Sequence, residues 1–141
     1  MVAGILIGHG KFPYALYDII KSIFGEVPNF EVISNQDCSG EELQKRVESA
    51  IQKLKSHDII IFVDLLGGSC GIISTKILKN KKTEETNQQT EPSQTKIGLI
   101  CPVNLPILIK FCQYRNEYNF QNLLQLLEET GRNEIKVFKK D

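Results

Sequence analysis

A histidine between two glycines is the first residue of this sequence whose surroundings suggest chemistry. His9 lies between Gly8 and Gly10, directly after the apolar residues 2–7. So short and apolar a run is typical of a strand buried on both faces, and the residues from Pro13 onward are typical of a helix. His9 is therefore expected at the carboxyl end of a strand, where parallel α/β sheets bind ligands. The alternative is an ordinary tight turn, and this stretch alone does not choose between the two.

Asp64 ends a second apolar run, residues 58–64, much as His9 follows the first. If the two runs form neighbouring parallel strands, their carboxyl ends lie at one edge of the sheet and place His9 beside Asp64. A carboxylate bonded to one imidazole nitrogen fixes the tautomer and directs the other nitrogen outward as a nucleophile. The pair is therefore a candidate acceptor for a phosphoryl group.

The turn after Asp64 offers the anion-binding groups that such a reaction needs. Gly67 and Gly68 precede Ser69, where a helical pattern begins. A helix start stabilises anions through its unpaired N–H groups and its dipole, and Ser69 adds a hydroxyl donor. A nucleophile, an orienting carboxylate and an anion-binding turn are the parts of a phosphohistidine carrier. No metal or other cofactor is required, because the donor is already an activated phosphate.

Each part of this predicted site also has a structural alternative. Asp64 could cap the turn that follows it, and Gly67 with Gly68 could only tighten that turn. Ser69 could serve only as a helix N-cap. Cys70 would complete a set of three possible metal ligands with the histidine and the aspartate, but three ligands without local spacing are a weak signal. The occurrence of three parts at one sheet edge favours phosphoryl transfer.

The composition fits one domain spanning residues 1–141 and argues against several other classes of protein. The formal net charge is zero and no basic stripe is present, so nucleic acid is not an expected partner. No apolar run is long enough to span a bilayer, and no signal peptide precedes the first predicted strand. The four cysteines form no CxxC pair and are expected to be free thiols, which predicts a cytoplasmic protein.

Strands alternate with helices along the chain, which predicts an α/β fold with a parallel sheet and helices on both of its faces. The strands are expected at residues 2–8, 30–33, 58–64 and 97–101, and the helices at residues 13–24, 69–79, 106–114, 119–129 and after a capping box that begins at Ser39. Gly131 is expected to end the last helix, and residues 135–138 are expected to form a short edge strand. Residues 80–96 are polar and are expected to form a surface loop.

Four segments resemble, in order and spacing, motifs of the enzyme IIA components of mannose-type sugar phosphotransferase systems. They are Gly8-His9-Gly10, FVDLLGGS at residues 62–69, VNLPIL at residues 103–108 and ETGR at residues 129–132. Each motif is weak alone, but the four together are specific. The resemblance extends over nearly the whole chain.

The resemblance implies a role for each candidate residue. His9 would receive a phosphoryl group from the histidine-containing phosphocarrier protein and pass it to a IIB component, and Asp64 would orient His9. Gly10 and Asn104 would lie in loops that face the site. The phosphoryl group would be bound by Leu65, Leu66, Gly67, Gly68 and Ser69. The membrane components IIC and IID would be indirect partners; because they bind the sugar, this chain does not reveal which sugar is transported.

The resemblance also implies a strand order of 2-1-3-4, with a C-terminal antiparallel strand exchanged between the subunits of a homodimer. Residues 134–138 fit that last strand. Three residues depart from the family pattern. Cys70 and Gly71 occupy positions where the family has proline and an aromatic residue, and Pro102 occupies a glycine position. The details of the phosphate-binding turn and of the IIB-binding surface are therefore expected to differ.

Two alternative functions are compatible with the same fold. One is the phosphoryl donor subunit of dihydroxyacetone kinase, against which the complete Gly-Gly-Ser and Val-Asn-Leu-Pro segments speak. The other is a regulatory domain without transfer activity, because a fold does not determine a function. Such a domain would be free to lose His9 or Asp64, and this chain has both.

Overall fold

The computed structural model describes residues 1–84 and 95–141, and these ranges form four strands and five helices. The elements are β1 (Ala3–Gly8), α1 (Phe12–Phe24), β2 (Phe30–Ser34), α2 (Gly40–Lys53), β3 (Ile59–Val63), α3 (Ser69–Glu84), β4 (Ile97–Ile100), α4 (Leu105–Tyr114) and α5 (Phe120–Asn133). The predicted alternation of strands and helices is confirmed.

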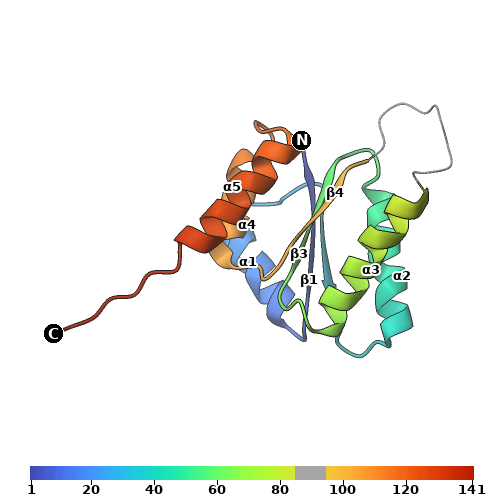
Figure 1. Cartoon of the computed structure of the whole chain (residues 1–141), viewed down its shortest axis with the longest axis horizontal. Helices are drawn as coiled ribbons and strands as arrows, with labels where there is room; N and C mark the ends of the chain where they lie inside the picture. The colour runs from blue at the N-terminus through green and yellow to red at the C-terminus, as the bar shows by residue number, and fades with distance from the viewer. Residues whose placement is uncertain (85–94) are drawn as a thin grey trace.

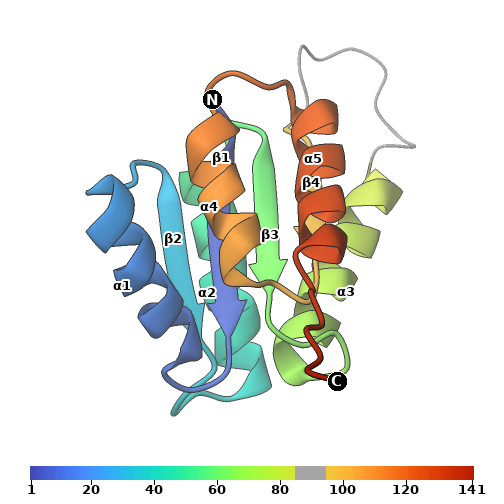
Figure 2. The ribbon, with the colours of Figure 1, turned by 90° about the vertical axis from the view of Figure 1, so that its left-hand side faces the viewer.

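The strands form one parallel sheet in the order β2-β1-β3-β4. Helices α1, α4 and α5 cover one face of the sheet, and α2 and α3 cover the other (Figures 1 and 2). This is the predicted α/β architecture with the predicted strand order. The carboxyl ends of β1 and β3, the two central strands, therefore meet at the same edge.

The central strands are buried on both faces, which explains why they are apolar throughout. Leu6 and Phe62 point toward one face and pack in the cluster that α1, α4 and α5 complete. Ile5, Ile7 and Ile61 point toward the other face and pack with α2 and α3. Alternate residues of a strand face opposite sides of a sheet, so one apolar cluster packs on each face of the same strands. The sheet is a rigid platform for the groups at its edge.

Local sequence signals account for several helix starts. Ser39 and Glu42 form the predicted capping box of α2, in which each side chain accepts a hydrogen bond from the other residue's backbone N–H. Pro13 lies in the first turn of α1, where the N–H that proline lacks would have no helical acceptor.

Within residues 1–84 and 95–141, no helix has both the length and the apolar character needed to cross a bilayer.

Two predicted boundaries are wrong. Gly131 does not end α5, which continues to Asn133; a Cβ at Gly131 would lie 2.7 Å from Cδ1 of Ile107, so this glycine lets α5 approach α4 closely. Helix α3 extends to Glu84, and the predicted loop at residues 80–96 therefore begins later than expected. Residues 85–94 of that loop lie outside the described ranges.

The predicted edge strand at residues 135–138 does not form within the single chain, and its exchange in a dimer stays a prediction. In the described C-terminal range, residues 135–141 form no strand and extend away from the end of α5 (Figure 1). The side chains of Ile135, Val137 and Phe138 are 76%, 77% and 91% exposed. The alternating apolar pattern of this segment is therefore not satisfied within the fold.

Candidate functional site

The register of β1 and β3 places the predicted histidine and aspartate side by side. Ile7 pairs with Val63 at the end of the two parallel strands. Gly8 ends β1 and Asp64 follows β3, and a Cβ at Gly8 would lie 3.2 Å from Oδ2 of Asp64. His9 follows immediately in the turn between β1 and α1. Two short apolar strands thus position two polar groups.

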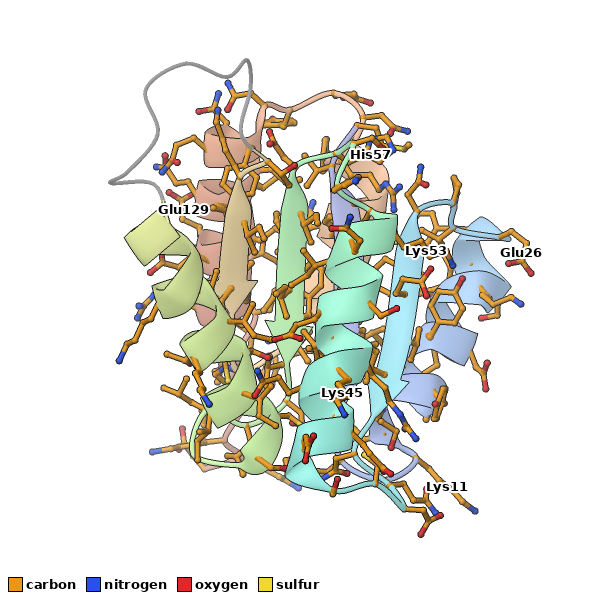
Figure 3. The ribbon with its side chains drawn as sticks, turned by 90° about the vertical axis from the view of Figure 1, so that its right-hand side faces the viewer. Lys11, Glu26, Lys45, Lys53, His57 and Glu129 are labelled. Carbon is orange, nitrogen blue, oxygen red and sulfur yellow. The ribbon has the colours of Figure 1, made fainter. Side chains whose placement is uncertain are left out.

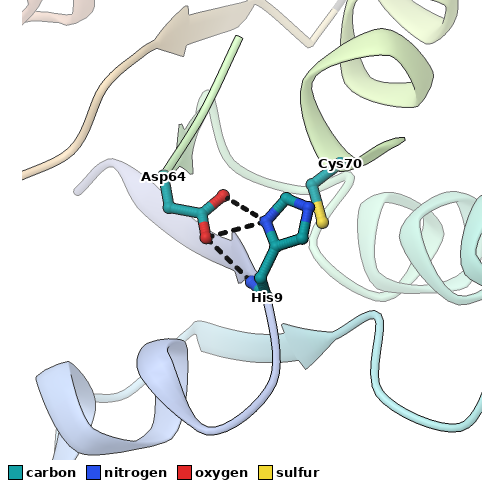
Figure 4. A group of neighbouring side chains, drawn as sticks. All are labelled: His9, Asp64 and Cys70. Carbon is teal, nitrogen blue, oxygen red and sulfur yellow. Dashed lines mark hydrogen bonds and ion pairs between the residues drawn. The ribbon is translucent and has the colours of Figure 1, made fainter. Parts of the chain in front are cut away.

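Asp64 binds both the backbone and the ring of His9. Nδ1 of His9 lies 3.0 Å from Oδ1 and 2.9 Å from Oδ2 of Asp64, and the His9 N–H donates to Oδ2 at 2.8 Å. An ionised carboxylate only accepts, so the proton of the neutral ring lies on Nδ1 and the lone pair lies on Nε2. Figure 4 shows Nε2 turned away from Asp64. The His9 side chain is 40% exposed and that of Asp64 is 13% exposed, so the imidazole is accessible and its partner is shielded.

Gly68 packs directly against the outward side of the imidazole. A Cβ at Gly68 would lie 2.7 Å from Cε1 and 2.9 Å from Nε2 of His9, closer than a side chain tolerates. The neighbouring Gly67 has open space around it. The turn between β3 and α3 therefore approaches Nε2 of His9 through Gly68 in particular.

The first turn of α3 provides donors beside this nitrogen. Ile72 N–H donates to the carbonyl of Gly68, and the N–H groups of the three preceding residues have no acceptor within the helix. The exposed Ser69 adds its hydroxyl, and the helix dipole favours an anion at this end. This arrangement is suited to the oxygens of a phosphoryl group on Nε2.

Leu65 and Leu66, the remaining two residues of the predicted phosphate-binding turn, shape it with their backbone rather than with their side chains. The side chains of Leu65 and Leu66 are exposed. Their carbonyl groups fold back over Gly71, where a Cβ would lie 2.5 Å from the oxygen of Leu65 and 2.3 Å from that of Leu66. The glycine that departs from the family pattern is therefore needed for the path of this turn.

Cys70 lies next to the pair, as its position in the sequence suggested. The side chains of His9, Asp64 and Cys70 each offer one possible metal-ligand atom, and these three atoms lie within 4.8 Å of one another. Burial and the nearby Asp64 carboxylate raise the pKa of the Cys70 thiol to about 11, so the thiol is protonated at neutral pH. Both oxygens of Asp64 already contact the His9 ring. Because the Asp64 carboxylate is already engaged, the three groups give little support to a metal site.

Gly10 and Asn104, the two predicted facing-loop residues, differ in their relation to the site. Gly10 follows His9 with a φ of +56°, a left-handed conformation that glycine adopts without strain. Asn104 is the N-cap of α4, and its Oδ1 accepts a hydrogen bond from Ile107 N–H at 3.0 Å. Val103 N–H donates to the carbonyl of Val63, so this loop adjoins the end of β3. The Asn104 side chain is nevertheless engaged in its own helix.

Two polar residues at the end of β2 reach the His9 turn and were missed in the sequence. The Gly10 N–H donates to Oδ1 of Asn35 at 3.1 Å, and the hydroxyl of Ser34 donates to the Gly10 carbonyl at 2.6 Å. The signal that selected His9 and Asp64, a polar residue directly after an apolar strand, also applies to Ser34 and Asn35. The run at residues 30–33 is short, which weakens this signal, and the contact of these residues with the His9 turn depends on the pairing of β1 with β2.

Comparison with known proteins identifies the family. Residues 4–128 match the family model of the PTS system fructose IIA component. The PTS system fructose-specific EIIA component of Bacillus subtilis (strain 168) is 27% identical over 97% of this chain and 86% of its own length. The sorbose-specific EIIA component of Lacticaseibacillus casei is 32% identical over 57% of this chain and 59% of its own length.

A solved structure supports the same fold. The crystal structure of the phosphotransferase system component EIIA from Streptococcus agalactiae has a TM-score of 0.81 at 19% identity, covering 97% of both chains. Membership implies a phosphocarrier role in a sugar phosphotransferase system and partners among its other components. The chain belongs to the family of mannose-type EIIA components of the phosphotransferase system.

Proposed function

We propose that His9 accepts a phosphoryl group from the histidine-containing phosphocarrier protein and passes it to a IIB component. The IIB component would serve sugar uptake through the membrane components IIC and IID. One observation carries the proposal. The Nδ1 of His9 is held by the shielded Asp64 carboxylate, while the accessible ring presents Nε2 to Gly68 and the start of α3.

The transfer is a substitution at phosphorus that requires no further reagent. Nε2 of His9 attacks the phosphorus of the donor's phosphohistidine, the new N–P bond forms, and the donor's N–P bond breaks. The donor ring, protonated on its second nitrogen, is released as neutral imidazole. The His9 ring keeps the proton on Nδ1 and becomes cationic, and the Asp64 carboxylate compensates that charge. The first turn of α3 stabilises the phosphoryl oxygens during both transfers.

The surroundings of the site suit protein partners. Phe12, Leu65, Leu66 and Ile72 lie close in sequence to His9 or to the phosphate-binding turn, and their side chains are exposed. Exposed apolar residues beside a reactive group are typical of a docking surface. A phosphocarrier protein and a IIB component would bind here in turn, since both must reach Nε2.

The proposal predicts that the protein gains one phosphate from the phosphoenolpyruvate-driven donor mixture. Intact-mass spectrometry after incubation with phosphoenolpyruvate, enzyme I and the phosphocarrier protein should find one added phosphate that is lost in acid. Omission of the phosphocarrier protein should prevent the addition. No added phosphate with several donor proteins would instead favour the regulatory domain without transfer activity.

Asp64→Asn is expected to slow phosphoryl transfer by about 10²- to 10⁴-fold, as when the orienting carboxylate of a histidine is replaced by an amide. An amide can donate to Nδ1, which favours the tautomer with its proton on Nε2, and it does not compensate the cationic ring. The rate is measured with purified phosphorylated phosphocarrier protein in a quenched-flow experiment. Asp58→Asn, which makes the same charge change before β3, is the matched control. Equal rates in both variants would contradict the orienting role.

The proposed assembly is a homodimer of single-domain chains spanning residues 1–141. Strand β4 is an edge of the sheet, and a cavity of about 770 Å³ lies beside it, lined in part by Leu99, Cys101, Leu124 and Ile135. An unpaired edge and an exposed alternating segment are complementary elements. The terminal segment of one subunit would pair with the other subunit and bury the apolar side chains that the isolated chain exposes.

The dimer can be tested by multi-angle light scattering. We expect the full chain to have twice its monomer mass of 16.0 kDa. A chain that ends at residue 134 should be monomeric and keep its circular dichroism spectrum, because residues 135–141 form no part of the sheet. A strictly monomeric full chain would rule out the exchanged segment.

The proposed location is the cytoplasm, where phosphoenolpyruvate and the donor proteins are found. Cys38, Cys70, Cys101 and Cys112 are free in the structure. Burial raises the pKa of Cys112 to about 11, so this thiol, like that of Cys70, is protonated and unreactive at neutral pH. Free thiols of this kind are typical of proteins in a reducing compartment.

A further inference from the structure

From the contacts at the end of β2, we infer that Asn35 is a positioning residue for phosphoryl transfer, an inference that rests on the proposed function. Asn35 would connect the His9 turn to the phosphate-binding start of α3. It would also orient the hydroxyl of Ser69 as a donor toward the phosphoryl oxygens.

The place of Asn35 follows from the register of β1 and β2. Gly8 pairs with Ser34, the last residue of β2, and Asn35 N–H donates to the carbonyl of Gly8 at 3.1 Å. Asn35 therefore lies beside His9 on the side of β1 opposite to Asp64, which follows β3. The histidine is flanked by one polar residue from each neighbouring strand.

The end of β2 holds both peptide groups of Gly10. The Gly10 N–H donates to Oδ1 of Asn35 at 3.1 Å, and the Gly10 carbonyl accepts from the buried Ser34 hydroxyl at 2.6 Å. Phe12 N–H donates to the carbonyl of His9 and closes the turn. The path of the chain just after the nucleophile is thus determined by β2 as well as by β1.

The hydrogen bonds of Asn35 have a definite direction. The Gly10 N–H can only donate, so the atom that faces it is Oδ1, and Nδ2 is left as the donor to Oγ of Ser69 at 3.4 Å. A serine hydroxyl that accepts from Nδ2 directs its own proton elsewhere. Ser69 is exposed at the start of α3, so that proton is available to a phosphoryl oxygen on His9. Asn35 thereby determines the direction in which the Ser69 hydroxyl donates its proton.

This direction makes a comparison of two substitutions informative. Asn35→Ala removes both hydrogen bonds, and the Ser69 hydroxyl becomes free to rotate. Asn35→Asp keeps the acceptor for Gly10, and hence the turn, but its second oxygen accepts from Ser69. The hydroxyl proton then points away from the phosphoryl group, and a negative charge is added beside it. Asn35→Asp should therefore impair transfer more than Asn35→Ala, although it resembles asparagine more closely.

The test measures transfer from purified phosphorylated phosphocarrier protein to the wild type, Asn35→Ala, Asn35→Asp, Ser69→Ala and the double variant Asn35→Asp/Ser69→Ala. We expect kcat to fall about 10-fold in Asn35→Ala and further in Asn35→Asp, as for a lost bond to a charged group. The KM for the donor protein should change less than twofold, because the docking residues are untouched. Ser69→Ala should cause no additional loss in the Asn35→Asp background, since the hydroxyl is already misdirected.

The outcomes separate this inference from the proposed function. Rates within twofold of the wild type in both Asn35 variants, or additive losses in the double variant, would overturn the role of Asn35. A wild type that accepts no phosphate would overturn the proposed function itself. Asn122→Asp on the exposed surface of α5 is the control for the added charge and should transfer like the wild type. Circular dichroism checks folding, and Asn35→Asp provides the test even if Asn35→Ala is unstable.

Discussion

His9→Ala is expected to gain no phosphate under conditions that convert the wild type completely. The substitution removes the proposed nucleophile and leaves the sheet intact, because the His9 side chain is part of the exposed turn rather than of either apolar cluster. Intact-mass spectrometry at mildly alkaline pH, where phosphohistidine persists, measures the result directly. The expected loss is complete, because the substitution removes the Nε2 that would form the N–P bond.

The chain contains a matched control for this experiment. Its second histidine, His57, lies just before β3, at the opposite end of the sheet (Figure 3). Lys11, two residues after His9, marks the site's end of the sheet in the same view. His57→Ala should accept one phosphate like the wild type. A phosphate that persists in His9→Ala, or disappears in His57→Ala, would show that the site is assigned to the wrong residue.

Gly68→Ala should reduce the rate of phosphoryl transfer by about 100-fold, the effect typical of a displacement of a reacting group by about 1 Å. The added methyl group would lie 2.7 Å from Cε1 and 2.9 Å from Nε2 of His9. The ring is the end of a flexible, partly exposed side chain, so it moves while the fold remains. We therefore expect a large loss of kcat with little change in the melting temperature.

Gly67→Ala separates this steric effect from a general stiffening of the turn. A Cβ at Gly67 has no atom within 4 Å, and Gly67 precedes Gly68 in the same segment. The variant should transfer phosphate at a rate close to that of the wild type. Equal effects of the two substitutions would mean that flexibility of the turn, rather than contact with the His9 ring, is what matters.

The position of the candidate site at one edge of the sheet could be predicted from the sequence, because local patterns determine it. Two short apolar runs end in His9 and Asp64, and parallel strands bring such ends together whatever the details of packing. The Ser39 capping box likewise acts within one turn of helix and was predicted correctly. Gly68 was predicted as part of an anion-binding turn, but its contact with the His9 ring depends on tertiary distances that the sequence does not contain.

Other features depend on contacts that no local pattern reports. Gly131 has the residue type of a helix end, yet it serves the packing of α5 against Ile107 of α4. Residues 135–138 have a strand pattern, but a strand needs a partner, and the described part of the chain provides none for them. Asn35 was overlooked because its role depends on the pairing of β1 with β2. Tertiary contacts thus decided what periodicity did not.

The most direct measurement is the position of the phosphorus on the imidazole ring. Protein labelled with ¹⁵N and phosphorylated by the donor mixture is examined by NMR for coupling between ³¹P and the ring nitrogens of His9. Since Asp64 holds Nδ1, we expect the coupling at Nε2, with Nδ1 still protonated. Phosphorus on Nδ1, or on a residue other than His9, would contradict the proposed orientation of the nucleophile by Asp64.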